Sequence, residues 1–214
     1  KAKVKVNTML GSLDSNTITQ AKQAENQGFH CLKIKLGLKP LTIELAQLKA
    51  LLKQISASTI IRLDANKSWT IEESEWLLQQ LKPYTKQIDS IEEPLKNVDN
   101  STYRQLQNKT SIALALDESF SSSDTLDLFP VQRLILKPMA QGGLVKTLQR
   151  VQQAQQRGIE CIITSSIESG YGLWAITHCC AAVNNQQYHG IATAAWLQNT
   201  LITPPEINNG RITF

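Results

Sequence analysis

The sequence predicts an α/β fold in which parallel strands and helices alternate along one domain. Short apolar runs rich in β-branched residues alternate with helical stretches of roughly 10–15 residues, which is typical of βαβ units. Three of these runs end in an acid, at Asp64, Glu92 and Asp117, and each lies about one strand–helix unit beyond the last. No GxGxxG or phosphate-loop pattern follows the first strand, which disfavours a doubly wound open sheet. Seven or eight such units in one domain favour a closed α/β barrel.

Several elements carry clear boundary signals. Gly28 is a good stop for the first helix, and Pro40 occupies the first turn of the second. Thr70, followed by Glu72 and Glu73, marks the start of the third helix. The expected strands are residues 3–10, 31–36, 59–63, 88–91, 111–116, 131–136, 159–164 and 190–193. The expected helices are residues 14–28, 40–55, 70–81, 99–107, 121–128, 143–157 and 172–183, and the segment after residue 196 is expected to be irregular.

Composition and charge exclude several classes of protein. A hydrophobic fraction of 42% and a charged fraction of 19% are those of an ordinary globular protein, so we treat residues 1–214 as one domain. The formal net charge is +4, but the lysines are scattered and no basic tract is interleaved with aromatic residues, so we expect no nucleic-acid partner. The apolar runs are too short to span a bilayer and no signal peptide is visible, so we expect no membrane association.

Cysteine usage and the first residue bear on compartment and completeness. Cys31, Cys161, Cys179 and Cys180 show no CxxC spacing, which favours a reduced, cytoplasmic compartment. The chain begins at Lys1, without a methionine, directly in a strand-like run. We therefore expect it to be a piece of a longer protein.

Acidic side chains at neighbouring strand ends predict a cation site. In an α/β barrel the carboxyl ends of the strands form the active site, so Asp64, Glu92 and Asp117 are expected to converge there. Like charges held together shift one another's pKa, and a divalent cation resolves that repulsion. All-oxygen ligands without His or Cys suit Mg²⁺ better than Zn²⁺. The alternative for each acid is a helix cap or a surface ion pair.

Lysines near the same strand ends predict acid–base chemistry. Lys33 and Lys35 are two residues apart on one strand and therefore face the same side. Adjacent ammonium groups are expected to lower each other's pKa, which makes a lysine a usable general base. Lys137 ends the sixth strand, across the barrel from the pair. The alternatives are an exposed strand face for the pair and a structural role for Lys137.

Five short motifs then occur in a fixed order. They are Lys33-Ile34-Lys35 with Gly37, Leu63-Asp64-Ala65-Asn66, Ile91-Glu92-Glu93-Pro94, Asp117-Glu118-Ser119 and Leu136-Lys137-Pro138. Together they resemble the enolase superfamily, in its muconate-lactonizing-enzyme subgroup. Within that subgroup, the stretch at residues 164–169 with Gly172-Leu173 is most similar to the o-succinylbenzoate synthase family.

The resemblance implies a fold and a reaction. The fold would be a modified (β/α)7β barrel, and residues 1–214 would be the C-terminal catalytic barrel domain. The reaction would be the Mg²⁺-dependent syn-dehydration of 2-succinyl-6-hydroxy-2,4-cyclohexadiene-1-carboxylate to o-succinylbenzoate through a metal-stabilised enediolate, in menaquinone or phylloquinone biosynthesis. The partner would be an N-terminal capping domain of the same protein, which is absent from this segment and would close over a small carboxylate substrate.

The resemblance also implies a role for each matching residue. Asp64, Glu92 and Asp117 would bind Mg²⁺. Lys35 would abstract the α-proton and return a proton to the departing hydroxyl, Lys33 would lower the pKa of Lys35, and Lys137 would stabilise the enediolate from the opposite face. The expected supports and substrate contacts are Asn66 and Glu118, which would orient the ligands, and Ser165 and Ser166, which would lie near the succinyl arm.

Two other functions remain open from the residues. A racemase or epimerase of N-acylated amino acids or dipeptides would use Lys35 and Lys137 on opposite faces of one carbon. A binding or regulatory barrel without chemistry would use the same residues structurally. His30, His178 and His189 show no metal-ligand spacing, and Trp174 and Trp196 are expected to be packing residues.

Overall fold

The computed structural model describes residues 2–97, 99–120, 130–183, 186–199 and 201–214. In these ranges one parallel sheet has its strands in chain order. Its strands are β2 (Thr8–Ser12), β3 (Cys31–Lys35), β4 (Ile60–Asp64), β5 (Ile88–Glu92), β6 (Ala113–Leu116), β7 (Arg133–Leu136) and β8 (Glu160–Ile163). A smaller sheet has the order β10-β1-β9 and contains β1 (Lys3–Val6), β9 (Tyr188–His189) and β10 (Arg211–Thr213).

Hydrogen bonds across the gap between β8 and β1 close the barrel. The Gly190 amide donates to the Ile163 carbonyl over 2.9 Å, and the Ser165 amide donates to the Gly190 carbonyl over 3.0 Å. On the other side β9 pairs in parallel with β1, and the Asn7 amide donates to the His189 carbonyl over 3.0 Å. Since β1 runs directly into β2, the strands form a closed ring, which confirms the predicted barrel.

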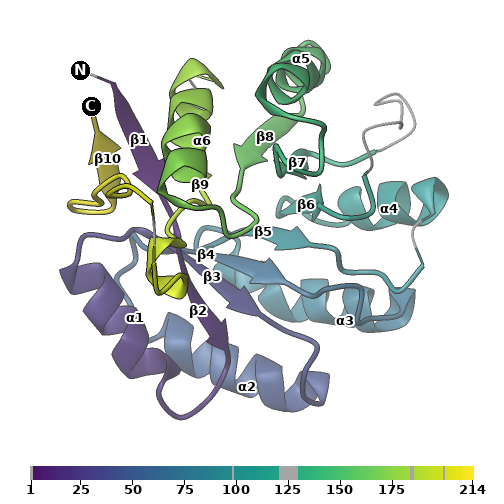
Figure 1. Ribbon diagram of the computed structural model, residues 1–214. Coiled ribbons are helices and arrows are strands. Elements are labelled where there is room, and N and C mark those ends of the chain that lie inside the picture. The colour runs from purple at the N-terminus through teal and green to yellow at the C-terminus, as the bar shows by residue number, and fades with distance from the viewer. Residues whose placement is uncertain (1, 98, 121–129, 184–185, 200) are drawn as a thin grey trace.

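Helices surround this ring, as Figure 1 shows. They are α1 (Thr17–Asn26), α2 (Leu41–Leu52), α3 (Ile71–Leu81), α4 (Asn100–Gln107), α5 (Leu144–Gln155) and α6 (Gly170–Val183). The predicted start of the third helix is confirmed by a capping box, in which the side chains of Thr70 and Glu73 each accept the other's backbone N–H. No helix in the described ranges is long and apolar enough to cross a membrane.

The structure corrects the sequence-based boundaries at the ends of the chain. The first strand is divided at Asn7 into β1 and β2, because the chain leaves the small sheet there and joins the large one. The expected strand at 190–193 is wrong: the eighth strand is Tyr188–His189, extended only by a bridge at Gly190. The segment expected to be irregular contains β10, which pairs with β1. The helix expected at 121–128 lies outside the described residues.

Alternating side chains divide the interior into two parts. Leu32, Ile34 and Leu36 are buried against the helices, in a core that lies between the strands and the helical layer. Inside the barrel a small separate cluster of Ala115, Ile135 and Ile162 fills the space between the strands. The intervening residues of β3, Lys33 and Lys35, therefore point into the barrel.

A charged network fills the barrel below the small apolar cluster. The Arg62 and Arg133 guanidinium groups donate to one Asp89 oxygen over 2.7 and 2.6 Å, and Arg133 also pairs with Glu160. Burial opposes ionisation of Asp89, but the two guanidinium groups outweigh it and lower the Asp89 pKa. Asp89, Arg133 and Glu160 sit near the amino ends of their strands, so side chains occupy that end of the barrel. Arg62 lies in the middle of β4 and also lines the cavity at the carboxyl end.

His189 at the closure predicts a pH dependence of stability. Its Nδ1 accepts the Ile163 N–H over 3.0 Å, and burial with the nearby Arg62 charge lowers the His189 pKa from 6.5 to about 3. Because the unfolded chain binds this proton more readily, the stabilisation is complete above pH 6.5 and is lost as pH falls toward 3. The expected contribution is up to about 1.4 kcal/mol per pH unit in that window.

Urea unfolding of wild type and His189→Asn between pH 7 and 4 measures this contribution. Asn can retain an acceptor for the Ile163 N–H but does not titrate. We expect the free energy of unfolding of wild type to fall more steeply with decreasing pH than that of the variant. Identical pH slopes would contradict this assignment.

Candidate active site

A cavity of about 190 Å³ opens at the carboxyl ends of the strands. Its lining contains the predicted residues Lys33, Lys35, Asp64, Asn66, Glu92, Asp117, Glu118, Lys137 and Ser165. The structure thus brings together side chains from β3, β4 and β5 and from the turns after β4, β6, β7 and β8. Ser166 does not line this cavity; its amide donates to a Glu168 carboxylate oxygen over 2.7 Å.

Strand register explains why the acids and lysines meet. Lys35 is the pairing partner of Asp64, and Asp64 is the pairing partner of Glu92, so these three lie on one level of the barrel. Asp117 follows the last residue of β6 and reaches the same mouth. In-register parallel strands therefore convert acids that are far apart in sequence into neighbours.

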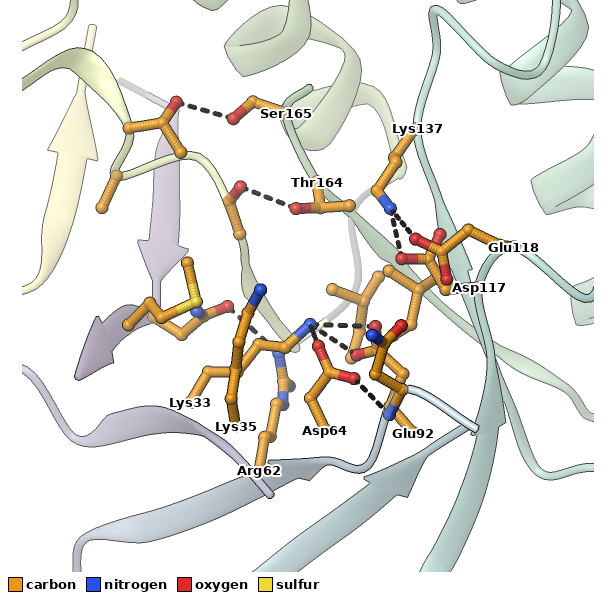
Figure 2. A pocket seen from close by; sticks show the side chains of 18 of the residues that line it. Lys33, Lys35, Arg62, Asp64, Glu92, Asp117, Glu118, Lys137, Thr164 and Ser165 are labelled. Carbon is orange, nitrogen blue, oxygen red and sulfur yellow. Dashed lines mark hydrogen bonds and ion pairs between the residues drawn. The ribbon is translucent and has the colours of Figure 1, made fainter. Parts of the chain in front are cut away.

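Two lysine ammonium groups neutralise the acids in this structure, as Figure 2 shows. The Lys33 Nζ lies 2.9 Å from Asp64 Oδ2 and 2.7 Å from Glu92 Oε2. On the opposite side of the cavity, the Lys137 ammonium donates to Asp117 and, over 2.8 Å, to Glu118. The acids of the mouth are thus divided between two cations.

The pKa shifts report crowding of negative charge. Burial is the main cause that raises the Glu92 pKa to about 8; Lys33 opposes the shift, and Asp64 and Asp117 add to it. Burial likewise raises the Asp117 pKa, although Lys137 opposes it. The expectation that the lysine pair lowers the Lys33 pKa is wrong. Burial does lower it, but the adjoining Glu92 and Asp64 carboxylates outweigh burial and raise the Lys33 pKa.

Lys35 differs from the other two cavity lysines. Within the described ranges its ammonium makes no hydrogen bond and no ion pair, and Figure 2 shows it extending into the cavity beside Lys33. Lys33 and Lys137 are both held by carboxylates. Lys35 is therefore the cavity lysine whose nitrogen is available to a substrate.

The side of the cavity formed after β8 and β9 carries polar but uncharged groups. The Ser165 and Thr193 hydroxyls are 2.6 Å apart, and the Thr164 hydroxyl donates to the Gly190 carbonyl over 2.9 Å. Trp196 also lines the cavity and is 49% exposed, so its expected role as a packing residue is wrong. Sequence reasoning missed Thr193; its position just after the last strand of the barrel was the available signal.

The three predicted carboxylates are the ligand type that a hard cation such as Mg²⁺ prefers, but their oxygen atoms do not surround a common position. Asp64, Glu92 and Asp117 offer only oxygen ligands, and the Lys33 ammonium already lies between two of them. In the described part of the chain, no group of three or more His, Cys, Asp or Glu side chains is close enough to hold a metal ion as the side chains stand. Asp117 is instead paired with Lys137.

These features define a class of protein: an α/β barrel with acids and lysines concentrated at its carboxyl mouth. Residues 16–214 match the family model described as Enolase C-terminal domain-like, and the chain belongs to that family. This confirms the enolase-superfamily resemblance predicted from the five motifs.

The chain is similar to named relatives of two different activities. An o-succinylbenzoate synthase from Klebsiella pneumoniae (strain 342) is 32% identical over 187 residues, which are 86% of this chain and 57% of that protein. A hydrophobic dipeptide epimerase from Enterococcus faecalis (strain ATCC 700802 / V583) is 29% identical over 204 residues, with the same two coverages. The crystal structure of MenC from Desulfotalea psychrophila LSv54 superposes with a TM-score of 0.88 at 27% identity, over 99% of this chain and 60% of that one. The chain thus spans little more than half the length of these relatives.

Removal of the Lys33 ammonium is expected to destabilise the metal-free protein. Lys33→Met leaves the Asp64 carboxylate without its cation and the buried Glu92 carboxyl group without its hydrogen-bond donor, which costs roughly 3 kcal/mol at pH 7. Lys35→Met is the matched control, because it removes a lysine from the same face of β3 that pairs with no acid in the described ranges. Its expected effect is within about 0.5 kcal/mol. Urea unfolding without divalent ions measures both, and equal stabilities of the two variants would contradict the pairing described above.

Proposed function

We propose that the whole protein catalyses the syn-dehydration of 2-succinyl-6-hydroxy-2,4-cyclohexadiene-1-carboxylate to o-succinylbenzoate, as a step of menaquinone or phylloquinone synthesis. The observation that carries the proposal is the state of the three cavity lysines. Lys33 and Lys137 are engaged by acids, whereas Lys35 extends into the cavity without an acid partner in the described ranges. Similarity to the o-succinylbenzoate synthase from Klebsiella pneumoniae supports this choice of substrate.

In this proposal Lys35 acts twice on one face of the substrate ring. In its amine form it takes the proton from the ring carbon that bears the carboxylate, and the released electron pair moves onto the carboxylate to give an enediolate. The pair then returns to form the new ring double bond as the carbon–oxygen bond to the hydroxyl breaks, and Lys35 gives its proton to the departing hydroxyl so that water leaves. One base on one face accounts for the syn course.

Asp64, Glu92 and Asp117 would hold Mg²⁺, since they offer oxygen ligands at neighbouring strand ends. When bound, Mg²⁺ would supply positive charge beside the substrate carboxylate, where negative charge grows as the proton leaves. Lys33 and Lys137 would release the acids that they now pair with. Lys137 would then face the substrate from the side opposite Lys35, and Asn66 and Glu118 would orient the acids.

The uncharged side of the cavity supports a substrate whose far end carries no positive charge. Thr164, Ser165, Thr193 and Trp196 contribute hydroxyl and indole groups there. The ammonium group of a dipeptide would find no acid among these four residues, whereas a succinyl arm could accept hydrogen bonds from the hydroxyls. Ser165 is therefore our proposed contact for that arm, and Ser166 would reach it only after a change in its turn.

An N-terminal capping domain is the proposed partner of the barrel mouth. Large apolar side chains are exposed in the turns at this end, including Leu38 after β3, Met139 after β7 and Ile167 after β8. A surface of this kind favours contact with another protein segment. The length of the relatives, of which this chain covers 57–60%, leaves room for such a domain. We place the protein in the cytoplasm, where its four cysteines would stay free, as they are here.

The test is turnover by the full-length protein in deuterated water, with Mg²⁺ present. We expect dehydration of the cyclohexadiene carboxylate and a loss of about 10²–10⁴-fold in kcat for Lys35→Ala. Lys49→Ala is the control, because this lysine contacts Gln80 on the outer surface and lies outside the cavity. Its kcat should stay within about twofold of wild type.

The same experiment separates the dehydratase from the epimerase, which the Enterococcus faecalis relative favours. Deuterium uptake at the α-carbon of N-acylamino acids or dipeptides, without dehydration of the cyclohexadiene, would replace the proposal by racemisation. Absence of both activities, together with no Mg²⁺ binding in a calorimetric titration, would indicate a barrel that serves for binding alone.

A further inference from the structure

We propose that Glu93 is a positioning residue, whose carboxylate fixes the turn that presents Asp117 to the cation site. The inference rests on the proposed function, because it concerns the same Mg²⁺ site. Glu93 follows Glu92 directly but is not part of the cavity lining. It therefore affects the site indirectly, through the residues to which it is hydrogen-bonded.

The Glu93 side chain is fully buried and accepts three hydrogen bonds from a single turn. One carboxylate oxygen accepts the N–H groups of Asp117 and Ser119 over 2.8 and 2.9 Å, and the other accepts the Ser119 hydroxyl over 2.6 Å. Both ends of the turn that begins with the acid are thus bound to one rigid group. Buried, charge-assisted hydrogen bonds of this kind are stronger than neutral ones.

The backbone of Glu93 links the neighbouring strand ends as well. Its N–H donates to the Ala115 carbonyl of β6 over 3.0 Å, and its carbonyl accepts the Lys67 N–H from the turn after β4 over 2.7 Å. Its φ of +46° is in the left-handed region, which costs a non-glycine residue of order 1–3 kcal/mol. The fold keeps a side chain there although glycine would avoid that cost, which points to the carboxylate as the group required.

In the described part of the chain, no lysine or arginine forms an ion pair with Glu93, so its charge is balanced by N–H and O–H donors. Without the carboxylate, the Asp117 and Ser119 donors would lose their buried acceptor and the turn would relax. Asp117 already binds the Lys137 ammonium, so a relaxed turn would leave it paired with the lysine. The predicted consequence of losing the Glu93 carboxylate is weaker Mg²⁺ binding, although Asp64, Glu92 and Asp117 are all still present.

Glu44, in the first turn of helix α2, provides a matched control at another strand end. It is equally buried, and its carboxylate accepts the N–H groups of Gly37, Leu38 and Lys39 over 2.8, 3.0 and 3.2 Å. The turn that it holds follows β3 and contains none of the three acids. Loss of either carboxylate removes three accepted hydrogen bonds, but only loss of Glu93 frees an acid of the proposed metal site.

The experiment compares Glu93→Ala, Glu93→Gln and Glu44→Ala with wild type in the full-length protein, at a temperature where all four are folded. Calorimetry gives the Mg²⁺ affinity, and urea unfolding gives the stability. We expect Glu93→Ala to bind Mg²⁺ about 10–100-fold more weakly. Glu44→Ala should lose stability but keep its Mg²⁺ affinity. Glu93→Gln keeps an oxygen for both N–H donors and should recover most of the affinity.

Equal Mg²⁺ affinities of Glu93→Ala and Glu44→Ala would overturn the positioning role, since any effect would then follow stability alone. If wild type binds no Mg²⁺, the proposed function fails, and amide hydrogen exchange in the metal-free protein decides the role of Glu93. Faster exchange at Asp117 and Ser119 in Glu93→Ala, but not in Glu44→Ala, supports it. Unchanged exchange at those two amides overturns it.

Discussion

Repulsion among acids at neighbouring strand ends is the constraint that the mouth of this barrel must satisfy. Glu92 lies between Asp64 on one side and Asp117 on the other, and burial together with these neighbours raises its pKa to about 8. The acids can share this space only with cations between them. In the structure the Lys33 and Lys137 ammonium groups provide that charge. The same requirement supports the proposed divalent ion, and Lys35, which pairs with no acid in the described ranges, is the proposed base.

The barrel supplies the geometry that brings this charge together. Parallel pairing in register sets Lys35, Asp64 and Glu92 on one level, which no flexible loop could do as reproducibly. Below them, the small apolar cluster and the Asp89–Arg133 ion pair fill the interior, and the cavity lies at the carboxyl ends of the strands. Left-handed backbone at residues such as Asn66 and Glu93 is concentrated in the turns at this end, where strain is most often linked to function.

Much of the fold and of the site could be predicted, because both rest on local patterns. The apolar run at residues 59–63 that ends in Asp64 specifies a strand tip, and the Thr70 signal specifies the helix after it. The eighth strand and β10 escaped prediction because their few residues are defined by pairing with β1, which is far away in sequence. The upward shift of the Lys33 pKa was not predicted for a similar reason. The spacing of Lys33 and Lys35 is visible in the sequence, but the contacts with Asp64 and Glu92 arise only when three strands align.

The central claim is that Asp64, Glu92 and Asp117 can hold one divalent ion in place of the lysine contacts. Crystals of the full-length protein grown with Mn²⁺, which binds oxygen ligands and scatters anomalously, test it directly. The account predicts an anomalous peak within ligand distance of all three carboxylates. The Lys33 ammonium would no longer lie between Asp64 and Glu92. No peak at the mouth at saturating Mn²⁺, with Lys33 still bridging the two acids, would contradict it.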